Sequence, residues 1–318
     1  MTNTYSFKVN QAHLRLDQYL VEKLPDYSRS KIQNYIRRGQ VVIDGKIGRP
    51  SMKLQGNEAV ECYFEVLAVD KSIIRQNIPI DIIYEDKDIV VINKPSGLVV
   101  HPGNGNHDGT LLNGLLYHFD TLSKEDSVRP GIVHRLDKDT SGVILIAKND
   151  KVHNNLSEQF SSRTVKKEYI AIIWGTIDSK GVIEGNIGRN PRNRQTYTMV
   201  ELDGKQSKTK FHLEEYFPPF SLVRLLPETG RTHQLRVHMK YIGHPIFGDT
   251  AYGGGIKYAK SFHMKYTKLI HRINKIIPRV ALHAKTLEII HPSTEKKMVF
   301  DAPLPIDFMQ TLDILKNE

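Results

Sequence analysis

The sequence of 318 residues contains a single cysteine, Cys62. One thiol cannot form a disulfide within the chain, so folding does not depend on an oxidising compartment, and a structural zinc site built from cysteines is excluded. Long apolar runs are also missing, because no stretch approaches the roughly 18 apolar residues that span a bilayer. Residues 1–20 lack the basic head and apolar stretch of a secretory signal. We therefore expect a cytoplasmic protein that does not enter a membrane.

Common metal and nucleotide motifs are missing as well. None of the 14 histidines falls in an H-E-x-x-H pattern. His233 and His238 lie five positions apart, which points them in different directions on a helix. The glycine-rich stretch 101–106 fits neither G-x-G-x-x-G nor a P-loop. We therefore expect no metal site and no nucleotide cofactor.

Positive charge is what the sequence has in excess. Lys and Arg total 45 against 35 Asp and Glu, which gives a formal net charge of +10 and a pI near 9.4. Such an excess favours a polyanionic partner, because each neutralised phosphate releases condensed counterions. Composition alone leaves open a basic protein without such a partner, so the position of the charge decides.

A small basic unit is expected near the N-terminus. Residues 14–20 carry apolar side chains spaced for a short helix, and residues 29–38 form a second helix whose apolar stripe is Ile32, Tyr35 and Ile36. A strand over residues 41–43 and a tight turn at residues 44–45 follow. One basic flank of such a unit can lie along a phosphate backbone, and its candidate contacts are Arg29, Lys31, Arg37 and Arg38.

Residues 13–75 resemble the S-four RNA-binding module, and SRSKIQNYIRRGQVVIDG carries most of the resemblance. The resemblance implies that the basic side chains of the second helix bind RNA. A basic helical hairpin that binds nothing is the alternative. Residues 70–80 read as a linker, because their composition is mixed and Pro79 discourages a regular element.

Residues 80–312 read as one α+β domain rich in strands. The β-branched runs 89–93 and 143–147 predict two strands, and 170–174 and 287–290 predict two more. Residues 150–163 carry apolar side chains at helical spacing. The length of the chain agrees with about two domains, at roughly 150 residues each.

The segment HRLDKDTSG, residues 134–142, is the first candidate for chemistry. Asp139, Thr140 and Ser141 are explained as a turn, because Asp and Ser bind nearby backbone amides. The turn does not explain Asp137 with Arg135 beside it. A carboxylate held near an arginine stays ionised and can act as a nucleophile or stabilise developing positive charge.

HRLDKDTSG resembles the active-site motif of the RluA/RluD-type pseudouridine synthases, which modify ribosomal or transfer RNA. Four more segments of this sequence resemble further motifs of that family and occur in the family's order: INKPSGLVVHPG, KKEYIAIIWG, ETGRTHQLRVHMKYIGHPIFGD and ALHAKTLEIIHP. The resemblance implies a mixed, largely antiparallel sheet with flanking helices, joined to the small α/β RNA-binding module. It also implies that uridines in structured RNA are isomerised to pseudouridine without a cofactor.

Individual roles follow from the same resemblance. Asp137 matches the catalytic aspartate, Tyr169 the tyrosine that stacks on the target base, and Arg231 the basic residue that pairs with the aspartate. Arg135 matches the arginine that fills the gap left by a flipped nucleotide, and we assign His134 to RNA contact with it. Arg231 is expected in the first turn of a helix with the stripe Leu235, Met239 and Ile242.

The substrate and the activity have alternatives. Large-subunit ribosomal RNA is the expected substrate, with transfer RNA as the alternative, and we expect a monomer that binds neither DNA nor membranes. A catalytically silent RNA-binding or ribosome-assembly protein on the same fold is a second hypothesis. A glycosidic-bond hydrolase is a third, although Asp137 has no evident second carboxylate beyond Asp139. Residues 253–280 interleave basic and aromatic side chains and are expected to be either an RNA-contacting arm or a solvated helical excursion.

Overall fold

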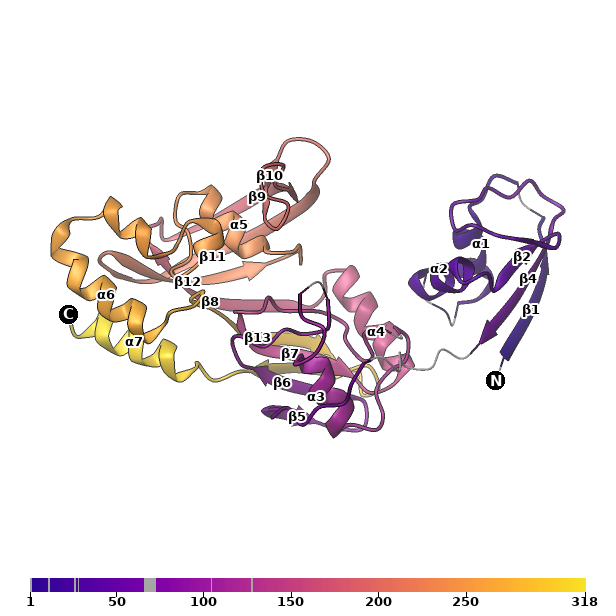
Figure 1. Ribbon diagram of the computed structural model, residues 1–318, viewed down its shortest axis with the longest axis horizontal. Coiled ribbons are helices and arrows are strands. Elements are labelled where there is room, and N and C mark those ends of the chain that lie inside the picture. The colour runs from indigo at the N-terminus through magenta and orange to yellow at the C-terminus, as the bar shows by residue number, and fades with distance from the viewer. Residues whose placement is uncertain are drawn as a thin grey trace.

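The computed structural model describes residues 2–10, 12–25, 27, 29–65, 73–103, 105–126 and 128–318. Within these residues the chain forms two β-sheets, each with its own helices and buried apolar side chains (Figure 1). The smaller sheet comes from the N-terminal residues and the larger one from the remainder. The α+β class expected from the sequence is confirmed.

The N-terminal sheet has four strands in the order β1–β4–β2–β3, paired antiparallel. The expected apolar stripe is confirmed, because Ile32, Tyr35 and Ile36 are almost fully buried against this sheet. The turn at Asp44 and Gly45 has φ values of 47° and 75°, as a type I′ hairpin requires. The elements are β1 (Thr2–Lys8), α1 (Leu16–Lys23), α2 (Arg29–Arg37), β2 (Val41–Ile43), β3 (Lys46–Ile47) and β4 (Ala59–Glu65).

The N-terminal unit begins earlier than the module expected from residue 13. Strand β1 pairs with β4 along its whole length, and Tyr5 and Phe7 pack against the same apolar core. At the other end, residues 66–72 lie outside the described residues, so the expected end at residue 75 falls just beyond them. Residues 73–81 contain neither helix nor strand, as the expected linker requires.

The larger sheet has ten strands in the order β10–β9–β11–β12–β8–β13–β7–β6–β5, with β14 paired to β13. Strands β13 and β7 run parallel, whereas the other pairs are antiparallel, so the mixed, largely antiparallel sheet is confirmed. The strands are β5 (Ile82–Glu85), β6 (Ile89–Lys94), β7 (Ser141–Ala147), β8 (Lys166–Trp174), β9 (Lys180–Arg189), β10 (Tyr197–Val200), β11 (Lys205–Phe217), β12 (Phe220–Pro227), β13 (Leu282–Ile290) and β14 (Lys297–Asp301).

Helices lie on both ends of this sheet (Figure 1). Helices α3 and α4 accompany strands β5 to β7, whereas α5, α6 and α7 accompany strands β8 to β12. The helices are α3 (Leu111–His118), α4 (Asp150–Ser161), α5 (Gln234–Tyr241), α6 (Thr267–Ile276) and α7 (Ile306–Lys316), with short 3-10 turns η1 (Thr250–Tyr252), η2 (Ile256–Ser261) and η3 (Met264–Tyr266). No helix among the described residues has both the length and the apolar character to cross a bilayer.

The segment 253–280 packs on the catalytic domain, so it is not a solvated excursion, whereas its contact with RNA stays a prediction. Leu269, Ile270 and Ile273 of α6 are buried in the main core, and Phe262 stacks on Trp174 with ring centroids 5.3 Å apart. Its lysines are exposed, whereas Arg279 is largely buried and binds Asp307. The segment therefore covers the apolar core with its apolar side chains and exposes its lysines to solvent.

Candidate active site

The loop that carries Asp137 is held by a buried lysine. Lys94, the last residue of β6, is 0% exposed, and its Nζ donates hydrogen bonds to the carbonyl oxygens of Pro95, Leu98 and Lys138 at 2.8, 2.9 and 3.0 Å. Burial lowers the pKa of Lys94 to about 7, although nearby carboxylates oppose the shift. This lysine ties the loop before β7 to the loop after β6.

The turn after Asp137 leads directly into the middle of the sheet. The Thr140 amide donates to the Asp137 carbonyl oxygen at 3.2 Å, and Ser141 Oγ is 2.9 Å from Nδ1 of the buried His283. The turn expected at Asp139, Thr140 and Ser141 lies slightly earlier, at Lys138 and Asp139, and Ser141 is already the first residue of β7. Asp137 is therefore displayed at the end of a buried strand, on a backbone with little freedom.

An arginine of helix α5 binds the Asp137 carboxylate. Arg236 Nη1 donates to Asp137 Oδ2 at 3.2 Å, while its Nε and Nη2 bind the two oxygens of Asp249 at 2.7 and 2.8 Å. Asp249 is 1% exposed, so the bidentate pair fixes the guanidinium and leaves its Nη1 to bind Asp137. Burial acts to lower the pKa of Arg236, but Asp249 and Asp137 outweigh it and raise that pKa, so the arginine stays charged.

The expected pair between Arg231 and Asp137 is wrong. Among the described residues, Asp137 forms an ion pair with Arg236 and has His233 as a neighbour, whereas Arg231 Nε donates to the Gln206 carbonyl oxygen at 3.0 Å. The physical reason is the start of the helix: α5 begins at Gln234, so Arg231 lies in the preceding turn and not in its first turn. Arg236 is inside helix α5 and faces the loop that carries Asp137. It belongs to the same sequence motif as Arg231, so the motif offered it as a second candidate.

His233 is a second neighbour of Asp137 that the sequence did not indicate. Its Nε2 is 3.8 Å from Asp137 Oδ1, and its Nδ1 is 2.7 Å from the Tyr252 hydroxyl. Burial lowers the pKa of His233, while the charge of Asp137 opposes the shift. The Tyr252 ring also lies over the Arg236 guanidinium, 4.8 Å from it. His233 and Tyr252 therefore complete the support of the carboxylate.

Asp137 and Tyr169 line one cavity of about 540 Å³, which is within the roughly 300–1,000 Å³ of small-molecule sites. Tyr169 comes from β8, and burial raises its pKa, with the negative charge of Asp137 adding to the shift, so its phenol stays protonated. Arg231 and Lys167 line the same cavity. Burial, together with the charge of Arg231, lowers the pKa of Lys167 to about 8.

Arg135 and His134 differ in what they offer to this cavity. The Arg135 side chain is exposed at the cavity wall, as a residue that replaces a flipped nucleotide must be. His134 Nε2 accepts a hydrogen bond from the Leu145 amide at 2.9 Å, and its ring stacks on Phe160 with centroids 4.7 Å apart. Burial lowers the pKa of His134 to about 3, so the ring is neutral. This geometry favours a support of the Asp137 loop over the expected RNA contact.

Comparison with known proteins agrees with this arrangement. Residues 88–241 match the profile of the family described as RNA pseudouridylate synthase, and residues 14–60 match that of the S4 domain. The protein called "Ribosomal large subunit pseudouridine synthase D" of Escherichia coli (strain K12) is 40% identical over 316 residues, which cover 99% of this chain and 94% of that protein. The chain belongs to the RNA pseudouridine synthase family.

A second relative and a solved structure are also similar to this synthase. "Uncharacterized RNA pseudouridine synthase YlyB" of Bacillus subtilis (strain 168) is 41% identical over 306 residues, covering 95% of this chain and 94% of that protein. The solved structure called "Human RNA Pseudouridylate Synthase Domain Containing 1" is 27% identical with a TM-score of 0.55, and covers 76% of this chain and 97% of that one. The synthase fold expected from the sequence is thereby confirmed.

The basic residues of helix α2 in this synthase are not equivalent. Arg37 and Arg38 are exposed, whereas Arg29 is half-exposed and binds the buried Asp17 at 2.9 Å. Lys31 is only 13% exposed and binds Glu125 of the catalytic domain at 2.8 Å, with Asp150 3.8 Å away. Lys31 therefore forms a contact between the two domains, and its expected RNA contact stays a prediction.

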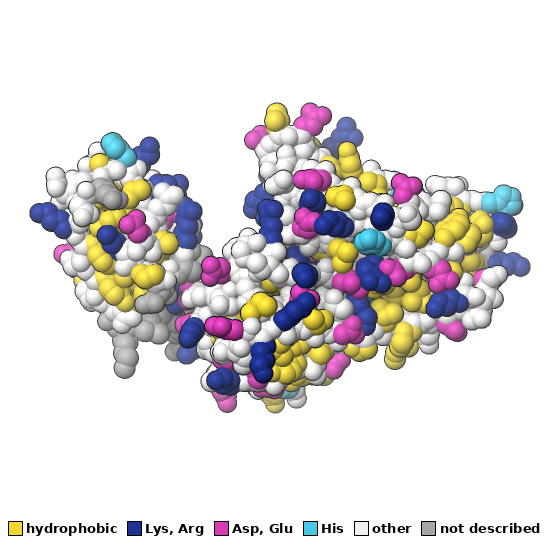
Figure 2. Space-filling model, turned by 180° about the vertical axis from the view of Figure 1, so that it is seen from behind, with side chains coloured by type: hydrophobic (Ala, Val, Ile, Leu, Met, Phe, Trp, Pro, Cys, Tyr) yellow, Lys and Arg dark blue, Asp and Glu magenta, His cyan; other side chains and the backbone are white. Residues whose placement is uncertain are grey.

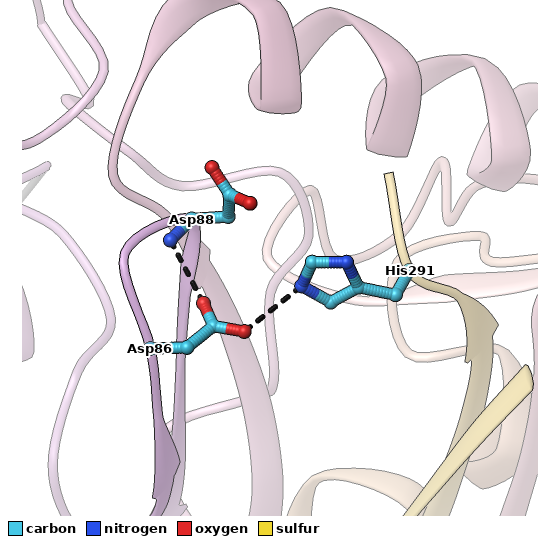
Figure 3. Close-up of side chains that lie close together, drawn as sticks. All are labelled: Asp86, Asp88 and His291. Atoms are coloured by element: carbon cyan, nitrogen blue, oxygen red, sulfur yellow. Dashed lines mark hydrogen bonds and ion pairs between the residues drawn. The ribbon is translucent and has the colours of Figure 1, made fainter. Parts of the chain in front are cut away.

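One cluster of the synthase has the residue types of a metal site. Asp86, Asp88 and His291 each offer an atom, and these atoms lie within 4.8 Å of one another, as Figure 3 illustrates. His291 Nδ1 accepts from the amides of Ser293 and Thr294, so its proton is on Nε2, which donates to Asp86 Oδ2 at 2.9 Å. A protonated nitrogen has no lone pair for a metal, so this histidine instead ties β13 to the turn before β6.

Proposed function

We propose that this synthase isomerises uridine to pseudouridine in large-subunit ribosomal RNA, with Asp137 as the catalytic carboxylate. The observation that carries the proposal is the cavity in which Asp137, bound by Arg236, shares the walls with Tyr169. The choice of ribosomal RNA is supported by the relative of that name, which is 40% identical over 99% of this chain. The S4 match supports binding to structured RNA.

The reaction exchanges bonds within one nucleotide. The target uridine leaves its stack, which costs a few kcal/mol, and enters the cavity. The glycosidic bond between carbon 1 of the ribose and nitrogen 1 of uracil breaks while Asp137 attacks that carbon or stabilises its positive charge. Uracil then turns and its carbon 5 bonds to carbon 1, which breaks any bond from that carbon to Asp137. The proton lost from carbon 5 is balanced by one gained at nitrogen 1. No redox step and no transferred group is needed, so the proposal includes no cofactor and no metal.

Three further residues support these steps. Arg236 keeps the carboxylate of Asp137 oriented and compensates its charge in the partly buried cavity. Tyr169 offers an aromatic face for the detached uracil, a kind of stacking that contributes roughly 1–3 kcal/mol per base. The exposed guanidinium of Arg135 takes the position in the RNA that the flipped uridine vacates.

Recognition of the larger RNA is assigned to the N-terminal unit, residues 13–75 in the sequence-based division, with the catalytic domain over residues 80–312. Arg37, Arg38 and the half-exposed Arg29 are its proposed phosphate contacts. We take the protein to act as a monomer in the cytoplasm, where ribosomal RNA is found.

The test is a pseudouridine map of total RNA from cells with and without this protein, made by carbodiimide labelling and primer-extension stops. We expect stops in large-subunit ribosomal RNA to disappear without the protein and to return with the wild type but not with Asp137→Asn. The variant should still bind RNA, because the substitution changes one cavity oxygen and none of the basic surface. If stops were lost only from transfer RNA, the proposed reaction would stand and transfer RNA would be the substrate. An unchanged map would favour a silent RNA-binding protein.

A further inference from the structure

A second cavity lies directly beside the active site. Its volume is about 350 Å³, and it is lined by helix α4 and by the loop that leads to Asp137. Val133, His134, Arg135 and Ser157 line both cavities, so the two cavities are adjacent. Apart from Arg135, which lies between the two, nothing in the proposed isomerisation uses this second cavity.

Two buried histidine nitrogens in this cavity form no hydrogen bond with any described residue. His153 on α4 is 7% exposed, and its Nδ1 has no hydrogen-bond partner among the residues that the structure describes. The buried Nδ1 of His101 is likewise unpaired within that part of the chain. Buried polar atoms are nearly always hydrogen-bonded, so two such nitrogens in one cavity point to a bound ligand. Burial lowers the pKa of both rings, so each is neutral and offers one donor and one acceptor.

The charge around the cavity indicates what that ligand is. Arg129, Arg135, Glu125 and Asp126 all line the cavity, and Glu125 is bound to Lys31. Arg129 is paired with Asp126 at 2.8 Å, whereas Arg135 is exposed at the boundary with the active site. A ligand with one anionic group near Arg135 and a polar, uncharged ring near the two histidines fits this distribution. A nucleotide has both parts.

The cavity also lies on the path from the active site to the N-terminal domain. Glu125 lines it and binds Lys31 of helix α2 at 2.8 Å. Figure 1 shows α4 on the side of the catalytic domain that faces the N-terminal domain. An RNA strand that leaves the active site toward Arg37 and Arg38 therefore passes this cavity.

We propose that the second cavity binds an unpaired nucleotide close to the target uridine, with its base against His101 and His153 and its phosphate against Arg135. The inference rests on the proposed function, because it takes the active-site ligand to be a uridine of RNA. Binding is non-covalent, and it fixes the register of the RNA so that one uridine of a loop reaches Asp137.

The experiment measures binding and turnover separately, with an RNA fragment that contains the mapped uridine. Each nucleotide of its loop is replaced in turn by an abasic one, and the Kd is measured by fluorescence anisotropy in the Asp137→Asn background. The protein variants are His153→Leu, which removes the ring nitrogens, and Asn154→Phe, which fills the cavity from its wall. Asn155→Phe, on the exposed side of the same helix, is the matched control.

We expect one abasic position other than the target to raise the Kd of the Asp137→Asn protein about tenfold, as the loss of one or two hydrogen bonds does. Adding His153→Leu or Asn154→Phe should raise the Kd for the intact RNA by a similar factor and remove the effect of that abasic position. Adding Asn155→Phe should change neither. If all abasic effects persist in both cavity variants, the cavity does not bind a nucleotide. A wild type that forms no pseudouridine would instead sink the proposed function, which the binding data do not test.

Discussion

Asp137 owes its orientation to Arg236, and Arg236 owes its own to Asp249. The motifs were sufficient to predict that Asp137 and Tyr169 share one site, and the structure places both in one cavity, while their catalytic roles stay predictions. The motifs were not sufficient to choose between Arg231 and Arg236, which belong to one motif. That choice depends on where α5 begins, and helix ends are poorly defined by local sequence.

The two arginines make a matched pair for mutation. We expect Arg236→Lys to lower kcat at least about a hundredfold, because an ammonium group cannot bind both oxygens of Asp249 and Asp137 in a planar fork. Arg231→Lys should lower kcat less than about tenfold, since that side chain bonds to a backbone carbonyl instead. Initial rates of pseudouridine formation at saturating RNA measure both. A larger loss of kcat in Arg231→Lys than in Arg236→Lys would show that Arg231 is the partner of Asp137 during the reaction.

Lys167 gives the active site a pH dependence. Its pKa is lowered to about 8, mainly by burial, so the side chain is charged below that pH and neutral above it. RNA phosphates favour the charged form, and affinity should therefore be full at lower pH and fall as the pH rises above about 8. We expect the Kd for RNA to rise about tenfold between roughly pH 7 and 9, the effect of one charged hydrogen bond.

Lys167→Arg separates this effect from the titration of uracil itself. Arginine stays charged throughout that range, so the variant should hold its affinity, whereas Lys167→Gln should be weak at every pH. Fluorescence anisotropy at constant ionic strength gives each Kd. A wild type and a Lys167→Arg variant that weaken in parallel would show that Lys167 does not bind the RNA.

At the scale of elements, the catalytic loop depends on how β7 meets β13. Gly142 follows the turn and has a φ of 113°, and a Cβ there would overlap the backbone carbonyl of Ala284 on β13. The two strands run parallel through the pairs His283–Ser141 and Ala284–Gly142, so their close approach needs a glycine.

Gly142→Ala should therefore lower the free energy of unfolding by about 2–4 kcal/mol, the sum of overpacking and backbone strain. It should also reduce kcat, because the displaced strand carries the Asp137 loop with it. Urea unfolding followed by circular dichroism measures the first effect. Gly103→Ala is the control, since a Cβ there meets nothing within 4 Å, and equal losses in the two variants would contradict the argument.

The elements that could be predicted are those whose signal is local. The β-branched runs became β6, β7, β8 and β13, and the apolar spacing of residues 150–163 became α4. Strand β1 was missed, because a strand is fixed by its partner and β4 lies more than fifty residues away, from Ala59 to Glu65. The inner face of segment 253–280 could not be seen either, since its packing on Trp174 is a long-range contact.

At the scale of the whole molecule, charge has two uses that sequence cannot separate. Lys31 and Arg37 belong to one helix, yet Lys31 binds Glu125 across 94 positions of sequence while Arg37 is exposed. Figure 2 shows dark-blue Lys and Arg side chains on both domains, with a gap between the domains over part of this face. The basic residues behind the net charge of +10 thus include some that bind the two domains to each other and some that are exposed to RNA.

Salt dependence distinguishes these two uses. Each phosphate contact contributes roughly 0.7–0.9 to the slope of log K against log salt concentration, because binding releases counterions. The double variant Arg37→Gln with Arg38→Gln should therefore weaken binding to structured RNA and reduce that slope by about 1.5. Lys31→Gln should leave the slope nearly unchanged, since its charge already faces Glu125, and the exposed Lys316→Gln at the far end of the catalytic domain is the control. A slope that falls as much for Lys31→Gln as for one arginine would mean that the contact with Glu125 opens when RNA binds, and that the two domains move apart to admit it.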